Sequence, residues 1–109
     1  MEEKLEDKEL FKIMFMQLIY TLQNAAVMQL GKVMNPMTNK IEKNLEQAKG
    51  TIEMLRMLKA KTAGNLEKQE QEMLDQVVLM LQLNYADEVA RDKKNAELKP
   101  EVKKEEEKK

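Results

Sequence analysis

The stretch 44–67, NLEQAKGTIEMLRMLKAKTAGNLE, constrains the fold most, because it predicts where one helix starts and stops and where the next begins. Asn44 can cap a helix, and Gln47, three residues on, can reach back to it as a capping-box partner. Gly64 can take the left-handed conformation that ends a helix, and Asn65 can cap the following one. Between these signals, apolar residues recur every three or four positions and share one helical face: Leu45, Ala48, Ile52, Leu55 and Leu58.

Two longer apolar patterns flank this stretch and predict two further helices. The first spans about residues 10–30, and its helical wheel shows one broad stripe: Phe11, Met14, Phe15, Leu18, Ile19, Leu22, Ala25, Ala26 and Leu30. The other spans about residues 66–98 and has an inner face of Met73, Leu74, Val77, Val78, Leu81, Tyr85 and Val89. Since glycine, proline and aromatic residues are few, we expect an all-α fold. In this fold we expect a long, a medium and a long helix that pack antiparallel, and we expect homo-oligomerisation to complete the arrangement.

The first predicted helix is also apolar on its other side. A helix with two apolar faces needs two partners, and a three-helix monomer of this size offers one core. We interpret the second face as an interface with another copy, and the alternatives are another protein or simple surface methionines. Its residues are Ile13, Met16, Tyr20 and Val27, and Met54 and Met57 form a smaller candidate strip on the second helix.

The segment between the first two helices, residues 33–43, is predicted to be a linker with a turn at Asn35-Pro36. The turn explains the sequence NPMTN better than a ligand-binding loop does. We expect three apolar side chains of the linker to fold back onto the core: Met34, Met37 and Ile41.

Composition divides the chain into three parts. Residues 1–9 are a charged lead-in that becomes helical near Leu5, and residues 10–90 form a single helical domain. Residues 91–109 are rich in charges of both signs. There we expect a charged helix extension that breaks at Pro100 and continues as a disordered tail.

The central stretch also carries a family resemblance. Its pattern I-E-M-L-x-M-L-x-x-K-T-x-G-N-L runs from Ile52 to Leu66, with Leu30-Gly31 and Pro36 before it. With these residues the chain resembles a small bacterial family known as domain of unknown function 1844, over roughly residues 11–89. The family usually has Thr-Pro after the final leucine, where this chain has Glu67-Lys68. The resemblance implies the helical fold and a bacterial origin, and it implies no activity, ligand or functional residue.

Missing residue types exclude most catalytic chemistry. The 109 residues contain no His, Cys, Ser or Trp. Nucleophile–histidine pairs, thiol chemistry, structural zinc sites and the usual di-iron ligands of helical bundles are therefore excluded. We interpret the carboxylate pairs Asp87-Glu88 and Glu70-Glu72 as solvated helix surface, and Tyr20 and Tyr85 as core or interface rings. We expect no catalytic, cofactor-binding or metal-binding residues, no cofactor and no enzyme activity.

Charge is distributed unevenly along the chain. Residues 31–62 have seven Lys or Arg against three Glu, whereas residues 63–90 have one Lys against six acidic residues. An antiparallel pair of helices can use such opposite charges to fix its pairing. The basic segment alternatively forms a nucleic-acid or ribosome-binding patch, although it has no aromatic residue to stack on bases. The patch comprises Lys40, Lys43, Lys49, Arg56, Lys59 and Lys61.

The sequence thus favours a non-catalytic interaction or adaptor module that forms a homo-oligomer, most simply a dimer. A further protein partner is the next expectation, and nucleic-acid or ribosome association through the basic patch is the alternative. The apolar run 11–30 is interrupted by polar side chains too often to face lipid. The acidic start MEEKLEDKE lacks the basic region of a signal peptide. We therefore expect a cytoplasmic protein without a membrane partner.

Overall fold

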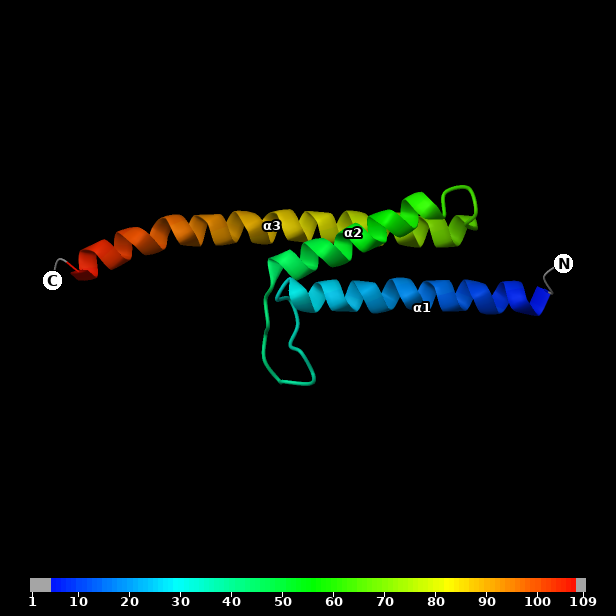
Figure 1. Cartoon of the computed structure of the whole chain (residues 1–109), viewed down its shortest axis with the longest axis horizontal. Helices are drawn as coiled ribbons and strands as arrows, with labels where there is room; N and C mark the ends of the chain where they lie inside the picture. The colour runs from blue at the N-terminus through cyan, green and yellow to red at the C-terminus, as the bar shows by residue number, and fades with distance from the viewer. Residues whose placement is uncertain (1–4, 108–109) are drawn as a thin grey trace.

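Three helices make up the computed structural model, which describes the backbone of residues 5–107 and the side chains of residues 6–96. They are α1 (Leu5–Gln29), α2 (Leu45–Lys61) and α3 (Lys68–Glu107). Successive helices run in opposite directions, and each helix packs against the other two (Figure 1). The predicted all-α, three-helix antiparallel fold is confirmed. The rest of the predicted lead-in and tail, residues 1–4 and 108–109, lies outside the described residues.

The core is small and lies where all three helices meet. Five large side chains are fully buried there, four from the three helices and one, Leu30, directly after α1: Ile19, Leu30, Leu55, Leu74 and Leu81. Smaller buried residues complete the cluster, and Phe15, Leu22 and Tyr85 pack against it from its edges. A core of this size supports only a marginally stable single domain.

The prediction that the whole apolar stripe of α1 lies in the core is wrong for three residues at the outer edge of the stripe. Phe11, Met14 and Leu18 are 51%, 53% and 44% exposed, although we expected them in the core. On a helical wheel, Phe11 and Leu18 point about 80 to 100° away from Ile19, which is fully buried. Because α1 contacts only α2 and α3, the arc that they cover is narrower than the apolar arc of the sequence.

Helix ends follow the predicted signals in part. The Asn44 side chain accepts a hydrogen bond from the Gln47 backbone N–H at 3.1 Å, as predicted for a cap. The backbone N–H of Asn44, however, donates to the Gln29 carbonyl at 2.8 Å and not to the Gln47 side chain. Gly64 has the expected positive φ of 82°. Asn65 does not cap α3, since α3 begins at Lys68. At the start of α3, the carboxylate of Glu70 instead reaches back and accepts a hydrogen bond from the Glu67 backbone N–H at 2.8 Å.

Residues 32–43, which we call the arm, leave the end of α1 and project past it on the side away from α3 (Figure 1). The arm is closed on itself, because the Asn35 N–H donates to the Lys40 carbonyl at 2.8 Å and the Asn39 N–H donates to the Asn35 carbonyl at 2.8 Å. The expected packing of its apolar side chains onto the core is wrong. The exposed fractions are 54% for Met34, 90% for Met37 and 62% for Ile41.

α3 continues past Pro100 to Glu107, so the helix break expected at Pro100 is wrong. A proline removes one backbone hydrogen bond and costs about 3 kcal/mol within a helix. The residues on either side of Pro100 are mostly Glu and Lys, with Ala and Leu before it, and these are good helix formers. With 40 residues, α3 is about 60 Å long, and it extends beyond α2, which has 17 residues.

Candidate interaction surfaces

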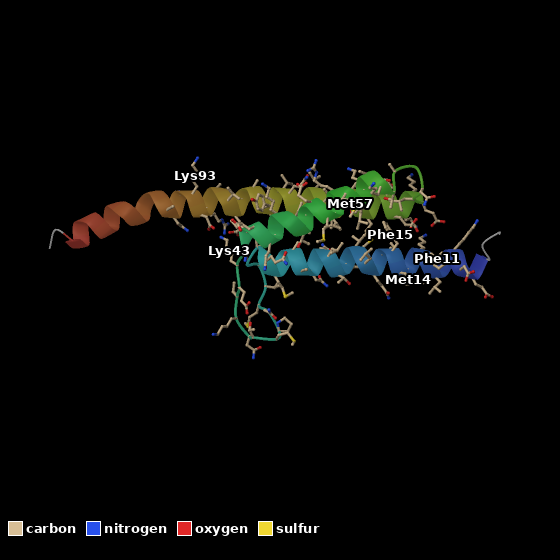
Figure 2. The ribbon with its side chains drawn as sticks, viewed as in Figure 1. Phe11, Met14, Phe15, Lys43, Met57 and Lys93 are labelled. Atoms are coloured by element: carbon tan, nitrogen blue, oxygen red, sulfur yellow. The ribbon has the colours of Figure 1, made fainter. Side chains whose placement is uncertain are left out.

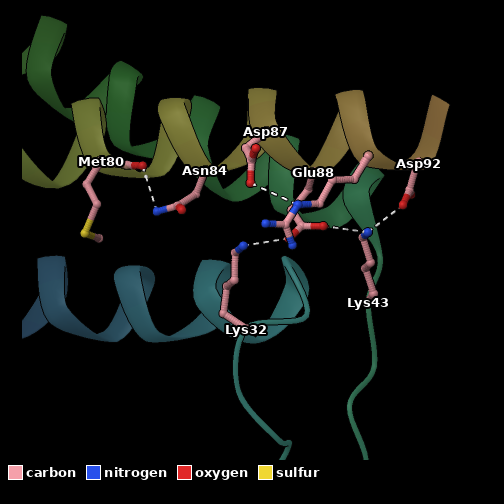
Figure 3. Close-up of polar contacts among 8 residues, drawn as sticks. Lys32, Lys43, Met80, Asn84, Asp87, Glu88 and Asp92 are labelled. Atoms are coloured by element: carbon pink, nitrogen blue, oxygen red, sulfur yellow. Dashed lines mark hydrogen bonds and ion pairs between the residues drawn. The ribbon is translucent and has the colours of Figure 1, made fainter. Parts of the chain in front are cut away.

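Glu88 lies at the junction of three chain segments and is only 6% exposed. One carboxylate oxygen accepts from Lys32 Nζ at 2.6 Å and the other from Lys43 Nζ at 2.7 Å (Figure 3). Lys43 Nζ also lies 2.6 Å from Asp92. Lys32 follows α1, Lys43 precedes α2, and Glu88 and Asp92 belong to α3. The carboxylate therefore ties both ends of the arm to the third helix.

These contacts change the proton affinities of the groups involved. The hydrogen bond from Lys32, followed by that from Lys43, lowers the pKa of Glu88 to about 2 from its ordinary value of 4.5. The hydrogen bonds to Asp92 and Glu88 raise the pKa of Lys43. Glu88 is thus a buried, charged structural group, and our interpretation of Asp87-Glu88 as a solvated pair is wrong for Glu88.

Glu70 corrects the interpretation of the second carboxylate pair. It is 8% exposed, and it accepts the backbone N–H at the start of α3. Both buried carboxylates therefore have structural partners within the fold. In the part of the chain that the structure describes, no three or more Asp and Glu side chains come together in a group able to hold a metal ion.

The polar contacts around the arm also connect α1 to α2. Gln29 accepts the Asn44 N–H through its backbone carbonyl, and its side-chain oxygen accepts from Thr51 Oγ1 at 2.7 Å. Gly31 lies in this junction with a φ of 78°, and a Cβ added to it would stand 3.1 Å from Lys43 Cβ. These contacts fix where the arm begins and ends.

Two members of the predicted basic patch form ion pairs with acidic residues of α3. Lys43 binds Glu88 and Asp92, and Lys59 Nζ lies 3.0 Å from Asp75 Oδ1 on α3. The hydrogen bond from Lys59 is the main cause that lowers the pKa of Asp75. Together with Lys32, three lysines of the basic segment therefore pair with acidic residues of α3.

The other members of the patch lie at the surface. Arg56 pairs with Glu53 of its own helix at 2.8 Å. Lys40, Lys49 and Lys61 are exposed and make no ion pair within 4.0 Å among the described side chains. The structure therefore leaves three separate lysines in place of a patch of six.

The candidate interface residues of α1 do not share one environment. Ile13 and Tyr20 are 54% and 55% exposed, Met16 is half-buried, and Val27 packs partly buried against the core. Of the α2 strip, Met54 and Met57 are both exposed, at 54% and 47%. The surface predicted from the sequence is thus present at Ile13, Tyr20, Met54 and Met57 and is reduced at Val27.

Sequence reasoning missed a second group of exposed apolar residues on α1, because we placed most of them in the core. Figure 2 shows Phe15 between α1 and the other helices, whereas Met14 points away from them. Residues 13–31 contain no charged residue at all, and that was the signal available in the sequence. The outward side of α1 is therefore an uncharged surface with large apolar side chains: Leu10, Phe11, Ile13, Met14, Leu18 and Tyr20.

Comparison with known proteins supports the resemblance seen in the sequence. A family model described as Domain of unknown function (DUF1844) matches residues 12–87, which is more than half of the chain. The chain belongs to this family. The DUF1844 match covers most of α1, the arm, α2 and the first half of α3. No curated protein and no solved structure gave a match.

Among the described residues, none of the helices is both long enough and apolar enough to cross a membrane. α1 is the most apolar of the three, and its polar residues are uncharged beyond Lys12.

Proposed function

We propose that this DUF1844 protein is a non-catalytic protein–protein interaction module that acts as a homo-oligomer, most simply a dimer. The cytoplasmic location expected from the sequence is part of this proposal. The observation that carries it is the outward side of α1, where large apolar side chains are exposed along a helix without a charge from residue 13 to residue 31.

Interface cores differ from ordinary protein surface chiefly by having few charged residues and more aromatic residues and methionine. The outward side of α1 has this composition, with Phe11, Met14 and Tyr20 all about half exposed. Asp, Glu, Lys and Arg make up 36% of the chain, and none of them lies between residues 13 and 31. A contiguous apolar surface on a small domain commonly marks a contact with another protein.

The small core points the same way. Among the side chains that the structure describes, only five large ones are fully buried, so a single chain has little apolar burial with which to offset the loss of conformational entropy. Pairing of two copies would bury the α1 side chains as well, and oligomerisation is a common source of stability for domains of this size.

The experiment that tests this proposal places a charge on the outward side of α1. Leu18→Glu should convert the oligomer to a monomer, because an unpaired carboxylate buried between two apolar helices costs several kcal/mol. Mass by light scattering is the measurement, and circular dichroism checks that the helices remain.

Leu79→Glu is the matched control. Leu79 is 58% exposed on α3, against 44% for Leu18, so the same substitution there should leave the mass unchanged. If Leu18→Glu and the wild type have the same oligomeric mass, α1 does not carry the association and this proposal is wrong.

A further inference from the structure

The arm is a projecting element with an unusual combination of order and exposure. Its turn is held by backbone hydrogen bonds between Asn35 and both Lys40 and Asn39, and by the Asn35 side chain, which accepts from the Met37 N–H at 2.9 Å. Its apolar side chains nevertheless point into solvent, including Met37 at 90% and Ile41 at 62% exposed. Methionine is common at adaptable binding surfaces, so an ordered hairpin that presents Met37 and Ile41 to solvent has the character of a contact element.

The position of the arm relates it to the uncharged side of α1. The arm leaves the last turn of α1 and extends beyond it, on the side that faces away from α3 (Figure 1). α1 and the arm thus form two sides of a corner. A helix that lies along the outward side of α1 would meet the arm at one end.

The outward side of α1 has the spacing of a helix-pairing seam. Positions that alternate by three and four residues place uncharged side chains along it: Phe11, Met14, Leu18, Thr21, Ala25 and Met28. This is the alternation by which two helices pack knobs into holes. From Phe11 to Met28 the seam is about 25 Å long at 1.5 Å per residue.

We propose that two copies of the chain pair α1 against α1 in antiparallel orientation, and that the arm of each copy covers the first turns of α1 in the other. This inference rests on the proposed function, because it assigns a geometry to the homo-oligomer. A two-fold axis near the middle of α1 relates the copies, so both use the same surface and the assembly closes as a dimer.

Charge favours the antiparallel orientation over the parallel one. The start of α1 carries Glu6, Asp7 and Glu9 with Lys8, whereas the other end of α1 leads into the arm, where Lys40 is exposed and makes no ion pair among the described side chains, and Lys32 and Lys43 are paired with Glu88 of their own chain. Antiparallel pairing places the acidic start beside the partner copy's arm, and parallel pairing places two acidic starts together. Opposite charges at the rim of an interface select the orientation, and like charges penalise the alternative.

Side-chain size fits the same orientation. When Leu18 of one copy lies beside Thr21 of the other, Met14 meets Ala25 and Phe11 meets Met28. Each large side chain then faces a smaller or a flexible one, which is how facing layers of a helix pair fill space.

Cross-linking of introduced cysteines tests this geometry, because the chain has no cysteine of its own. Leu10→Cys and Met37→Cys are made as separate, differently tagged chains, at positions that are 50% and 90% exposed. The two chains are co-expressed and treated with a short bis-maleimide. Each chain carries a single cysteine, so any product that carries both tags joins two chains.

The expected result is a cross-linked dimer that carries both tags, with little product from either variant alone. Leu79→Cys co-expressed with Met37→Cys is the control and should give little product. Efficient linkage of Leu10→Cys chains to each other would indicate parallel pairing and overturn the inference. A stable dimer that shows no Leu10 to Met37 product would also overturn it and leave the proposed dimer standing, whereas a monomer by light scattering would overturn the proposed function itself.

Discussion

At the scale of single residues, Glu88 is the group on which the packing of the arm depends most. Its two carboxylate oxygens bind Lys32 and Lys43, which are the first and last residues of the arm, and its side chain is only 7% exposed. Both lysine side chains are 31% exposed, so water still reaches one end of each ion pair. Removal of the Glu88 charge should therefore cost more than the loss of a surface ion pair and less than the loss of one partner of a fully buried pair.

Glu88→Gln should lower the free energy of unfolding near neutral pH by about 1 to 3 kcal/mol, because the amide leaves two partly buried lysines without their anion. Urea unfolding of both proteins measures the difference. Asp87→Asn is the control, since Asp87 is its exposed neighbour and its ion pair with Arg91 lies at the surface at 3.3 Å. Equal loss of stability in the two variants would contradict the role given to Glu88.

The pH dependence of stability gives a second measurement on the same residue. The pKa of Glu88 is lowered in the folded chain to about 2, against 4.5 ordinarily, so the unfolded chain binds more protons between these values. The stabilisation by Glu88 is complete above about pH 4.5 and is lost as pH falls towards 2. The free energy of unfolding of the wild type should therefore fall more steeply with acid than that of Glu88→Gln, and parallel curves would be the contradictory result.

At the scale of the elements, local signals predicted the helices and long-range contacts decided what they bury. The α2 helix starts at Leu45 after the predicted cap Asn44, and Gly64 has the predicted conformation, because capping and turn formation involve residues within a few positions of one another. The ion pair between Lys32 and Glu88 joins residues 56 positions apart, and no local pattern indicates it.

The difference between local signals and long-range contacts also explains why we wrongly expected the whole apolar stripe of α1 to be buried. Periodicity showed that Phe11, Met14 and Leu18 share a side of the helix with Ile19, but the covered width depends on how two other helices pack against it. The candidate surface was predicted in part, through Ile13 and Tyr20. The outward position of Met14 and Leu18 could not be predicted, because a broad apolar arc is compatible with either burial or association.

Substitution by alanine should change the free energy of unfolding in opposite directions at Gly50 and at Gly31. Gly50 lies exposed within α2, and a Cβ there would meet nothing within 4 Å, so Gly50→Ala should raise the free energy of unfolding by about 0.5 to 1 kcal/mol. Gly31→Ala should lower it by about 1 to 2 kcal/mol, because the residue has positive φ and its Cβ would crowd Lys43. Thermal or urea unfolding compares them, and a stabilising Gly31→Ala would contradict the described junction.

At the scale of the whole molecule, the chain is elongated, because the 40-residue α3 extends beyond the region where the three helices meet (Figure 1). Its extents are 76, 29 and 17 Å, and its radius of gyration is 19.2 Å, whereas a compact domain of this length has about 13 Å. α1 is exposed along its outward side, and the arm stands beyond it. The proposed pairing of two copies would cover both the outward side of α1 and the arm.

The absolute mass of the purified wild-type chain, measured by light scattering over a concentration series and at two salt levels, tests this claim most directly. The chain has a mass of 12.8 kDa, and we expect a dimer of twice that mass at both salt levels. The dimer should withstand salt because the pairing surface is uncharged, and screening acts on charges. A monomer at every concentration would contradict the account and leave the outward side of α1 without the partner that we assign to it.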